Sequence, residues 1–251
     1  MIPSWGVRPS PVRRVRLFAL VAVRDGMRHL PGLLANIAPH VDGVVALDDG
    51  SRDGSAEFLE GRPEVVELIR NPAERPRWDE VANHRQLVAA ALQHGAEWAQ
   101  CIDHDERVER NFRTRAERVI ARGGRLGVTA FSLSVLELWD APDRYRADGV
   151  WGKKTKPTLF RLRADHEFDP RPLHGIKAPL QSRPVRRADL RVYHLGMLTA
   201  ADREARRARY EQLDPDARWQ AIGYAYLTDE TGLRLRRVPR RRGYSVRSSE
   251  V

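Results

Sequence analysis

The segment VVALDDGSRDGS (residues 44–55) decides the fold, because it is an apolar run that ends in two aspartates and a Gly-Ser turn. An earlier apolar run, VRLFALVAV (15–23), is separated from it by a helical pattern over residues 25–41. Parallel strands that are covered on both faces read as continuous apolar runs. The order strand, helix, strand therefore predicts a parallel α/β sheet with a right-handed crossover.

The next part of the chain repeats this order. A short helix from about Ser55 precedes a strand at 63–70, and a longer helix over about 79–94 precedes EWAQCIDHDE (97–106), a strand that runs into an acidic turn. Four such repeats predict a nucleotide-binding α/β domain.

The second half has a different character. We expect strands at 128–139, 156–162 and 190–196, with an irregular loop at 140–156 between the first two. Two amphipathic helices are expected within 199–228, broken at Asp214-Pro215. The predicted fold class is α/β, with a mostly parallel central sheet, flanking helices, a smaller mixed region and C-terminal helices.

The net charge of +10 on 251 residues invites a nucleic-acid interpretation, so its location matters. Residues 1–125 hold 19 Lys and Arg against 18 Asp and Glu, whereas residues 231–251 hold seven arginines and one acid. Much of the excess is therefore a tail, and nucleic acid is an unlikely partner. The tail is either solvated or in contact with an anionic membrane. A single cysteine excludes a disulfide framework.

Two acidic turns follow predicted strands, at 48–51 (DDGS) and at 103–106 (DHDE). Taken separately, the first is an ordinary turn in which Asp49 caps the next helix and Gly50 has a positive φ, and the second is a solvated turn. Together they lie at one edge of a parallel sheet, where ligands of α/β proteins bind. The chain has no glycine-rich phosphate loop, so we expect carboxylates and a divalent cation, Mg²⁺ or Mn²⁺, to hold any nucleotide.

VVALDDGSRDGS followed about 55 residues later by WAQCIDHDERV resembles a family 2 glycosyltransferase of the GT-A fold, over roughly residues 15–200. The resemblance implies a hexosyltransferase-like enzyme that uses a nucleoside-diphosphate sugar. It places donor-binding residues at the ends of the first, second and fourth strands and on the helix before the fourth: Ala22, Val23, Arg24, Asp48, Asp49, Arg85 and Asp103. It also implies that Asp105 holds the cation.

KPTLFRL (156–162), LHG (173–175) and VYHLG (192–196) are similar to segments of lipopolysaccharide-core-type members. This resemblance implies that His194 completes the metal or diphosphate site. An inverting transfer also needs a base for the acceptor hydroxyl. Gly175 stands where those relatives have Glu, so the candidates for this base are residues after the long strand: His174, Glu137, Asp140 and Asp169. Met197 and three aromatic residues form either a sugar platform or part of the core: Trp139, Tyr145 and Trp151.

The sequence thus predicts a metal-assisted glycosyltransferase acting on a carbohydrate or other hydroxyl acceptor. The predicted organisation is a disordered lead (1–14), a nucleotide-sugar-binding half (15–125), an acceptor-side half of the same domain (126–230) and the basic tail. The alternatives are a nucleotidyltransferase on a similar sheet and a basic binding protein for nucleic acid or anionic membrane. No apolar run approaches the roughly 20 residues of a membrane helix, so we expect a cytoplasmic location, with the tail either solvated or in contact with the inner face of the membrane.

Overall fold

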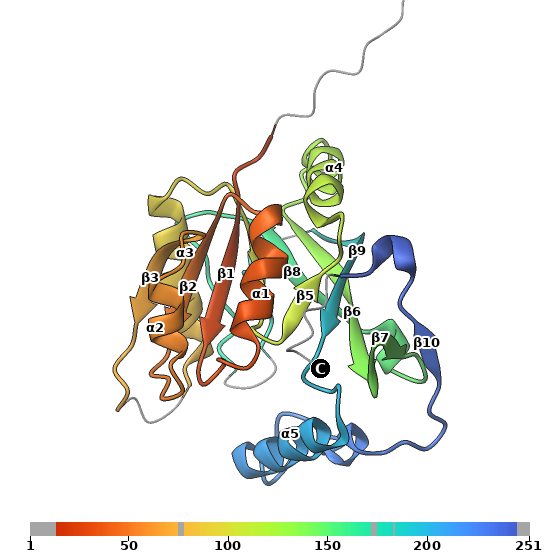
Figure 1. Cartoon of the computed structure of the whole chain (residues 1–251). Coiled ribbons are helices and arrows are strands. Elements are labelled where there is room, and N and C mark those ends of the chain that lie inside the picture. Colours follow the sequence, from red (N-terminus) through yellow and green to blue (C-terminus); the bar gives the residue numbers. More distant parts are fainter. Residues whose placement is uncertain (1–13, 75–77, 172–174, 183, 245–251) are drawn as a thin grey trace, which may run out of the picture.

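A computed structural model describes residues 14–74, 78–171, 175–182 and 184–244 (Figure 1). In chain order the elements are β1 (Leu17–Val23), α1 (Leu30–Ile37), η1 (Ala38–His40), β2 (Gly43–Asp48), α2 (Ser55–Glu60), β3 (Val65–Arg70), α3 (Glu80–Gln93), β4 (Trp98–Cys101), β5 (Glu106–Val108), α4 (Phe112–Gly124), β6 (Ala130–Trp139), β7 (Ala141–Arg146), η2 (Trp151–Lys153), β8 (Thr155–Arg161), β9 (Val185–His194), α5 (Ala200–Leu213), η3 (Ala225–Leu227), β10 (Leu235–Arg237) and η4 (Arg240–Arg242).

The described strands form one sheet in the order β10-β7-β6-β8-β4-β1-β2-β3, and β9 pairs with β6 and β5. Strands β1 to β4 are mutually parallel, while β8 pairs antiparallel with β4 and β6. This sheet, with its flanking helices and its mixed second half, confirms the predicted fold class. The chain moves outward from β1 to β2 and β3 and then returns to β4 on the other side of β1. Ligands of α/β sheets commonly bind at such a reversal, outside the carboxyl ends of the strands.

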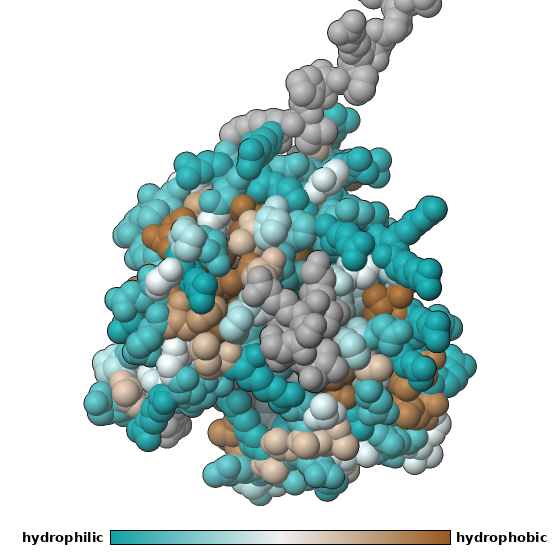
Figure 2. All heavy atoms as spheres, in the orientation of Figure 1, coloured by the Kyte–Doolittle hydropathy of each residue, from teal (hydrophilic) through white to brown (hydrophobic). Residues whose placement is uncertain are grey.

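Helices cover both faces of the parallel strands, as the unbroken apolar runs predicted. Alternate side chains of β1 point to opposite faces: Leu17, Ala19 and Val21 pack in the cluster that includes α1 and α4, whereas Phe18 and Leu20 pack with α3. The face seen in Figure 2 is mostly hydrophilic, with hydrophobic residues scattered over it. Within the described residues, no helix has both the length and the apolar character needed to span a membrane.

The two longest helices begin at local caps. The carboxylate of Asp79 accepts a hydrogen bond from the backbone N–H of Ala82 at the start of α3. Thr199 and Asp202 form a capping box at the start of α5. Such side chains satisfy backbone N–H groups that have no partner within the helix.

The second half departs from the prediction in two places. The loop 140–156 contains β7 and η2, and β7 extends the sheet beyond β6. Only the first of the two expected C-terminal α-helices forms, since α5 ends at Leu213 and a 3-10 turn, η3, stands in place of the second. The side chain of Asp214 accepts hydrogen bonds from the backbone N–H groups of Arg218 and Trp219, which holds a turn there instead of a helix.

The basic tail is folded against the protein up to Tyr244, while most of its arginines remain exposed to solvent: Arg234, Arg236, Arg237, Arg240 and Arg241. Strand β10 pairs with β7. Arg242 forms an ion pair with the buried Glu109 (2.5 Å), and the rings of Tyr193 and Tyr244 stack with centroids 5.0 Å apart. A buried carboxylate needs a cation nearby, and the tail supplies one. The lead, residues 1–13, and the end, 245–251, lie outside the described residues.

Candidate functional site

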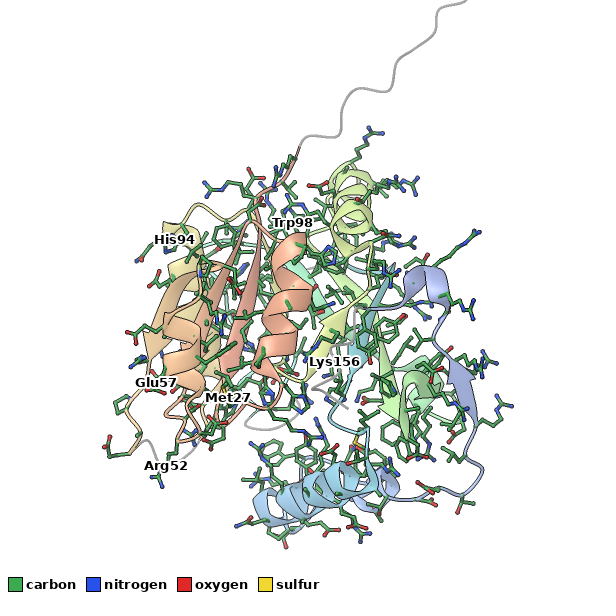
Figure 3. The ribbon with its side chains drawn as sticks, viewed as in Figure 1. Met27, Arg52, Glu57, His94, Trp98 and Lys156 are labelled. Carbon is green, nitrogen blue, oxygen red and sulfur yellow. The ribbon has the colours of Figure 1, made fainter. Side chains whose placement is uncertain are left out.

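The DDGSRDGS segment ties the loop after β2 to the loop after β1. Ser51 Oγ accepts from the backbone N–H of Asp25, Ser55 Oγ accepts from Gly26, and Asp53 accepts from Met27. Figure 3 shows Met27 and Arg52 together at the carboxyl-end edge of the sheet, far from His94 and Trp98 at the opposite edge. Much of the motif therefore shapes the edge of the sheet where a ligand is expected.

Asp49 is enclosed and does not cap α2, whose N-cap is Gly54. Its carboxylate pairs with Arg24 (2.8 Å) and accepts a hydrogen bond from the amide of Asn71 (2.7 Å). Because the Asp49 side chain has no exposed surface, its role is to hold its neighbours in place. Arg24, which is partly exposed, is the side chain that the end of β1 presents to solvent. Val23 is also fully buried, and Ala22 is half-buried.

Asp48 organises the turn that follows it. Its Oδ1 accepts from the N–H groups of Gly50 (3.0 Å) and Ser51 (2.9 Å), and Gly50 has the expected positive φ of 83°. Asp48 Oδ2 is buried and has no hydrogen-bond partner among the described residues. The carboxylate thus retains an acceptor atom that a ligand N–H or hydroxyl would satisfy after a small opening of the turn.

The second acidic turn lies among lysines. Asp103 forms an ion pair with Lys177, and Lys156 lies 3.7 Å from Asp103 and 3.2 Å from Glu106. Burial opposes ionisation of Asp103, but the two lysines outweigh it and hold the pKa of this carboxyl well below its usual range. The same carboxylates raise the pKa of Lys156. This part of the site is therefore fully charged, with ammonium groups beside the carboxylates.

Asp105, His194 and Glu137 form a buried row. His194 Nδ1 contacts Glu137, and Nε2 lies 3.0 Å from Asp105 Oδ2. Lys154 pairs with Glu137 from the other side. Burial opposes the charged imidazole, yet the carboxylates of Glu137 and Asp105 raise the pKa of His194 to about 9. Despite their burial, His194 holds the pKa of both carboxyls well below the usual range.

α5 completes this row through Arg206. Its Nη1 lies 3.4 Å from Asp105 Oδ2 and 3.3 Å from His194 Nε2. Gly196 allows the three groups to meet, because a Cβ there would lie 2.3 Å from Asp105 Oδ2 and 2.5 Å from Arg206 Nη1. Any larger residue at this position would displace them.

Asp105 and His194 are thus brought together, as the predicted metal site requires. Among the described residues there is no group of three or more His, Cys, Asp or Glu side chains arranged to hold a metal ion. Mg²⁺ is commonly held by one or two carboxylates together with substrate phosphates and water, so the Asp105 carboxylate suits a cation that binds with a diphosphate, whereas His194 is protonated beside it. A metal-binding histidine usually donates the N–H of its other ring nitrogen to a carboxylate, and the contact between His194 Nδ1 and Glu137 is of this kind.

The predicted catalytic bases are not brought to one place. Glu137 is completely buried between His194 and Lys154, a placement that does not support contact with an acceptor. Asp140 is half-exposed and pairs with Arg203 (3.0 Å), and Asp169 is paired with Arg171. His174 lies outside the described residues, so the identity of the base stays a prediction.

Trp151 adjoins this row, because Lys154, which pairs with Glu137, lies 5.9 Å from the centroid of the Trp151 ring. Arg85 is exposed on α3, between residues that face the sheet. Trp139, Trp151 and Met197 are buried together in a hydrophobic cluster, so they belong to the core and do not form a sugar platform. Tyr145, in contrast, is half-buried on β7.

Sequence reasoning missed the basic half of the site, although one compositional signal pointed to it. The chain has 44 basic residues, of which only four are lysine: Lys153, Lys154, Lys156 and Lys177. Three of the four pair with carboxylates of this site. Figure 3 shows Lys156 in the middle of the molecule, beside the strands that carry these acids.

Comparisons with known proteins give relatives of unestablished function. The sequence matches no protein-family profile. It is 28% identical over 222 residues to uncharacterized proteins of Mycobacterium tuberculosis (Rv3786c) and Mycobacterium bovis (Mb3815c), covering 84% of this chain and 54% of those proteins. The chain therefore spans about half the length of the curated relatives it matches.

Among solved structures, the chain is similar to S. aureus TarS residues 1–349 in complex with UDP-GlcNAc, at 14% identity and a TM-score of 0.49 over 86% of this chain and 71% of that one. It is also similar to 4-diphosphocytidyl-2C-methyl-D-erythritol synthase, at 14% identity and a TM-score of 0.34 over 88% and 86% of the two chains. At identities and TM-scores this low, the similarities do not assign an activity to the chain.

Proposed function

We propose that the chain is a glycosyltransferase that moves a sugar from a nucleoside-diphosphate sugar to a hydroxyl acceptor. The observation that carries this proposal is the meeting of both acidic turns with cationic side chains at one edge of the sheet. The ends of β2 and β4 flank the end of β1, so Asp48, Arg24 and Asp103 lie at the same edge of the sheet, at the reversal of strand order where ligands of α/β sheets bind.

Different side chains at this edge of the sheet suit different parts of such a donor. The free oxygen of Asp48 and the Arg24 guanidinium offer an acceptor and donors to a base and ribose. Lys156, Lys177 and Arg206 supply positive charge for a diphosphate. The charge of the leaving group grows as the bond to the sugar breaks, and fixed cations stabilise it at that point.

We also propose that Asp105 and His194 hold Mg²⁺ or Mn²⁺ when the donor is bound. Such a cation neutralises the leaving diphosphate. Glu137, which is fully buried against His194, is then a positioning residue that keeps the proton on Nδ1. His194 faces Asp105 through Nε2 and has a pKa raised to about 9, so it would join the cation only with loss of the Nε2 proton.

A thermal-shift panel of UDP-, GDP-, dTDP- and CMP-sugars, each with and without Mn²⁺, tests the donor class, because a ligand that binds the native state raises its apparent stability. We expect one nucleotide series to stabilise the chain, and more strongly with Mn²⁺. Stabilisation by nucleoside triphosphates alone, with pyrophosphate release, would instead identify a nucleotidyltransferase. The chain spans about half the length of its mycobacterial relatives, so a search for the acceptor should include those longer proteins.

A further inference from the structure

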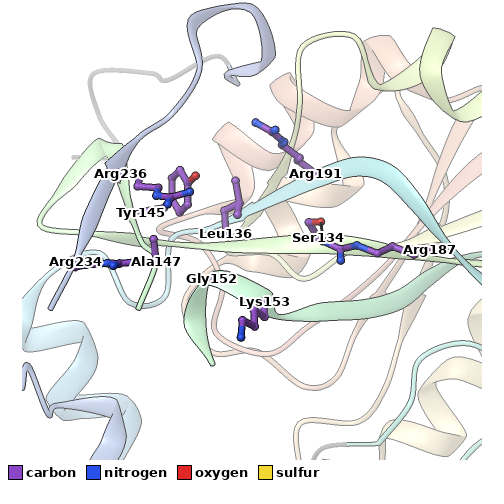
Figure 4. A pocket seen from close by; sticks show the side chains of 10 residues that line it. All are labelled: Ser134, Leu136, Tyr145, Ala147, Gly152, Lys153, Arg187, Arg191, Arg234 and Arg236. Carbon is purple, nitrogen blue, oxygen red and sulfur yellow. Dashed lines mark hydrogen bonds between the residues drawn. The ribbon is translucent and has the colours of Figure 1, made fainter. Parts of the chain in front are cut away.

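A cavity of about 360 Å³ is lined by residues from the second half of the chain (Figure 4). Strands β6, β7, β9 and β10 and the turn η2 contribute its lining. Five lining residues are cationic and none is acidic: Lys153, Arg187, Arg191, Arg234 and Arg236. The remaining lining is small or apolar, apart from Ser134 and the half-buried Tyr145.

The alternation of side chains along the strands separates this cavity from the acidic site. Ser134 on β6 is the register partner of Arg191 on β9, and both line the cavity. Glu137 and His194 are also register partners, each three residues further along its strand, and therefore point to the opposite face. On the outer strands, Tyr145 and Arg236 are partners that line the cavity together.

The cavity's cations have few acidic neighbours, although Arg191 is one of the cations that lower the pKa of Asp189, after Arg242 and Arg115. Within the described residues, none of the five forms an ion pair, although Arg146, next to Tyr145, pairs with Asp148 at 2.9 Å. Among the described residues, Arg187 donates to Ser134 Oγ (3.4 Å) and to no other group, and Arg191 Nη1 is buried without a hydrogen-bond partner. Mutual repulsion among clustered cations and an unsatisfied buried N–H both cost free energy that a bound anion would offset.

We propose that this cavity binds a phosphate-bearing anion. Guanidinium groups match the geometry of phosphate oxygens and donate two parallel hydrogen bonds to them. The volume lies within the range of small-ligand sites, and Leu136 and Tyr145 offer an apolar surface to the group esterified to the phosphate. The phosphate belongs either to a free molecule or to a lipid headgroup. This inference concerns a different face from the proposed donor site and does not depend on it.

The test is a calorimetric titration of the full chain with inorganic pyrophosphate at fixed ionic strength. The test variant is Arg187→Gln/Arg236→Gln. The matched control, Arg186→Gln/Arg237→Gln, removes the same charge from the adjacent, exposed positions of the same strands. Since pyrophosphate also suits the donor site, a third variant, Lys156→Gln/Lys177→Gln, separates the two sites. Flotation with phosphatidylglycerol vesicles, against phosphatidylcholine vesicles, is the lipid arm.

We expect the test variant to weaken pyrophosphate or vesicle binding at the cavity at least tenfold, and the control to change it less than twofold. The lysine variant should lose any binding at the donor site and keep the binding at the cavity. Dependence on Arg187 and Arg236 with pyrophosphate supports a free phosphate compound, and dependence with vesicles alone supports a lipid headgroup. Unchanged binding of both probes by the test variant would overturn the proposal. An equal loss in the control would also overturn it, because net charge would then explain the binding.

Discussion

Gly196→Ala probes the geometry of the acidic site without changing any charge. The added Cβ would lie 2.3 Å from Asp105 Oδ2, 2.5 Å from Arg206 Nη1 and 3.1 Å from His194 Nε2. Ordinary contact begins near 3.4 Å, so the carboxylate must retreat by about 1 Å. A misplacement of about 1 Å in a catalytic constellation can cost about 100-fold in rate, which is about 2.7 kcal/mol of transition-state stabilisation.

The assay is the initial rate at which the chain hydrolyses the donor that the thermal-shift panel identifies, with water as the acceptor of the sugar and nucleoside diphosphate as the measured product, expressed as kcat/KM. Gly61→Ala is the matched control, because a Cβ at Gly61 meets nothing within 4 Å and its φ is −83°. Melting curves establish that both variants are folded, since overpacking at Gly196 costs about 1–3 kcal/mol of stability. An unchanged kcat/KM in folded Gly196→Ala would refute the role of Asp105, His194 and Arg206 as one unit.

Three further variants test separate parts of the account. Lys177→Gln removes the main partner of Asp103, and we expect calorimetry to show about tenfold weaker binding of a nucleoside diphosphate. Burial lowers the pKa of His84 from 6.5 to about 4, so between these pH values the unfolded chain takes up a proton that the native chain does not. The free energy of unfolding therefore falls by up to about 3 kcal/mol as the pH drops from 6.5 toward 4. In His84→Gln, the free energy of unfolding measured with denaturant should depend less on pH over this range. Arg242→Gln leaves the buried Glu109 carboxylate short of its closest cation and should lower the free energy of unfolding by about 2–3 kcal/mol.

Specific outcomes would contradict each of these expectations. Full diphosphate affinity in Lys177→Gln would show that this lysine does not contribute to the donor site. A pH profile of His84→Gln as steep as that of the native chain would assign the acid sensitivity elsewhere. Arg241→Gln is the control for Arg242→Gln, since Arg241 is exposed beside it. Equal effects of the two would mean that the ion pair with Glu109 does not hold the tail.

The sequence predicted the elements whose pattern is local. Apolar runs predicted β1 and β2, and a helical pattern over about 79–94 predicted α3. The sequence did not predict β5, because this strand has three residues, of which two are charged but buried. It did not predict β7 and β10 either, because their side chains are mainly polar and the two strands depend on pairing with each other.

The acidic half of the site was predictable because its residues stand in two short motifs, whereas the basic half was not. Lys177 is 74 residues from Asp103 in the sequence, and Arg206 is 101 residues from Asp105. Nothing local links such pairs, since they meet only when β8, β9 and α5 are in place. The folding of the tail against the protein was unpredictable for the same reason, because Glu109, the ion-pair partner of Arg242, is 133 residues away in the sequence.

The central claim is nucleotide-sugar chemistry at Asp105. The most direct measurement is product analysis after incubation of the native chain and of Asp105→Asn with the nucleotide sugar that binds, in Mn²⁺ and in EDTA. We expect nucleoside-diphosphate release by the native chain in Mn²⁺, and almost none in EDTA or with the folded Asp105→Asn variant. Undiminished release by Asp105→Asn, or in EDTA, would contradict it.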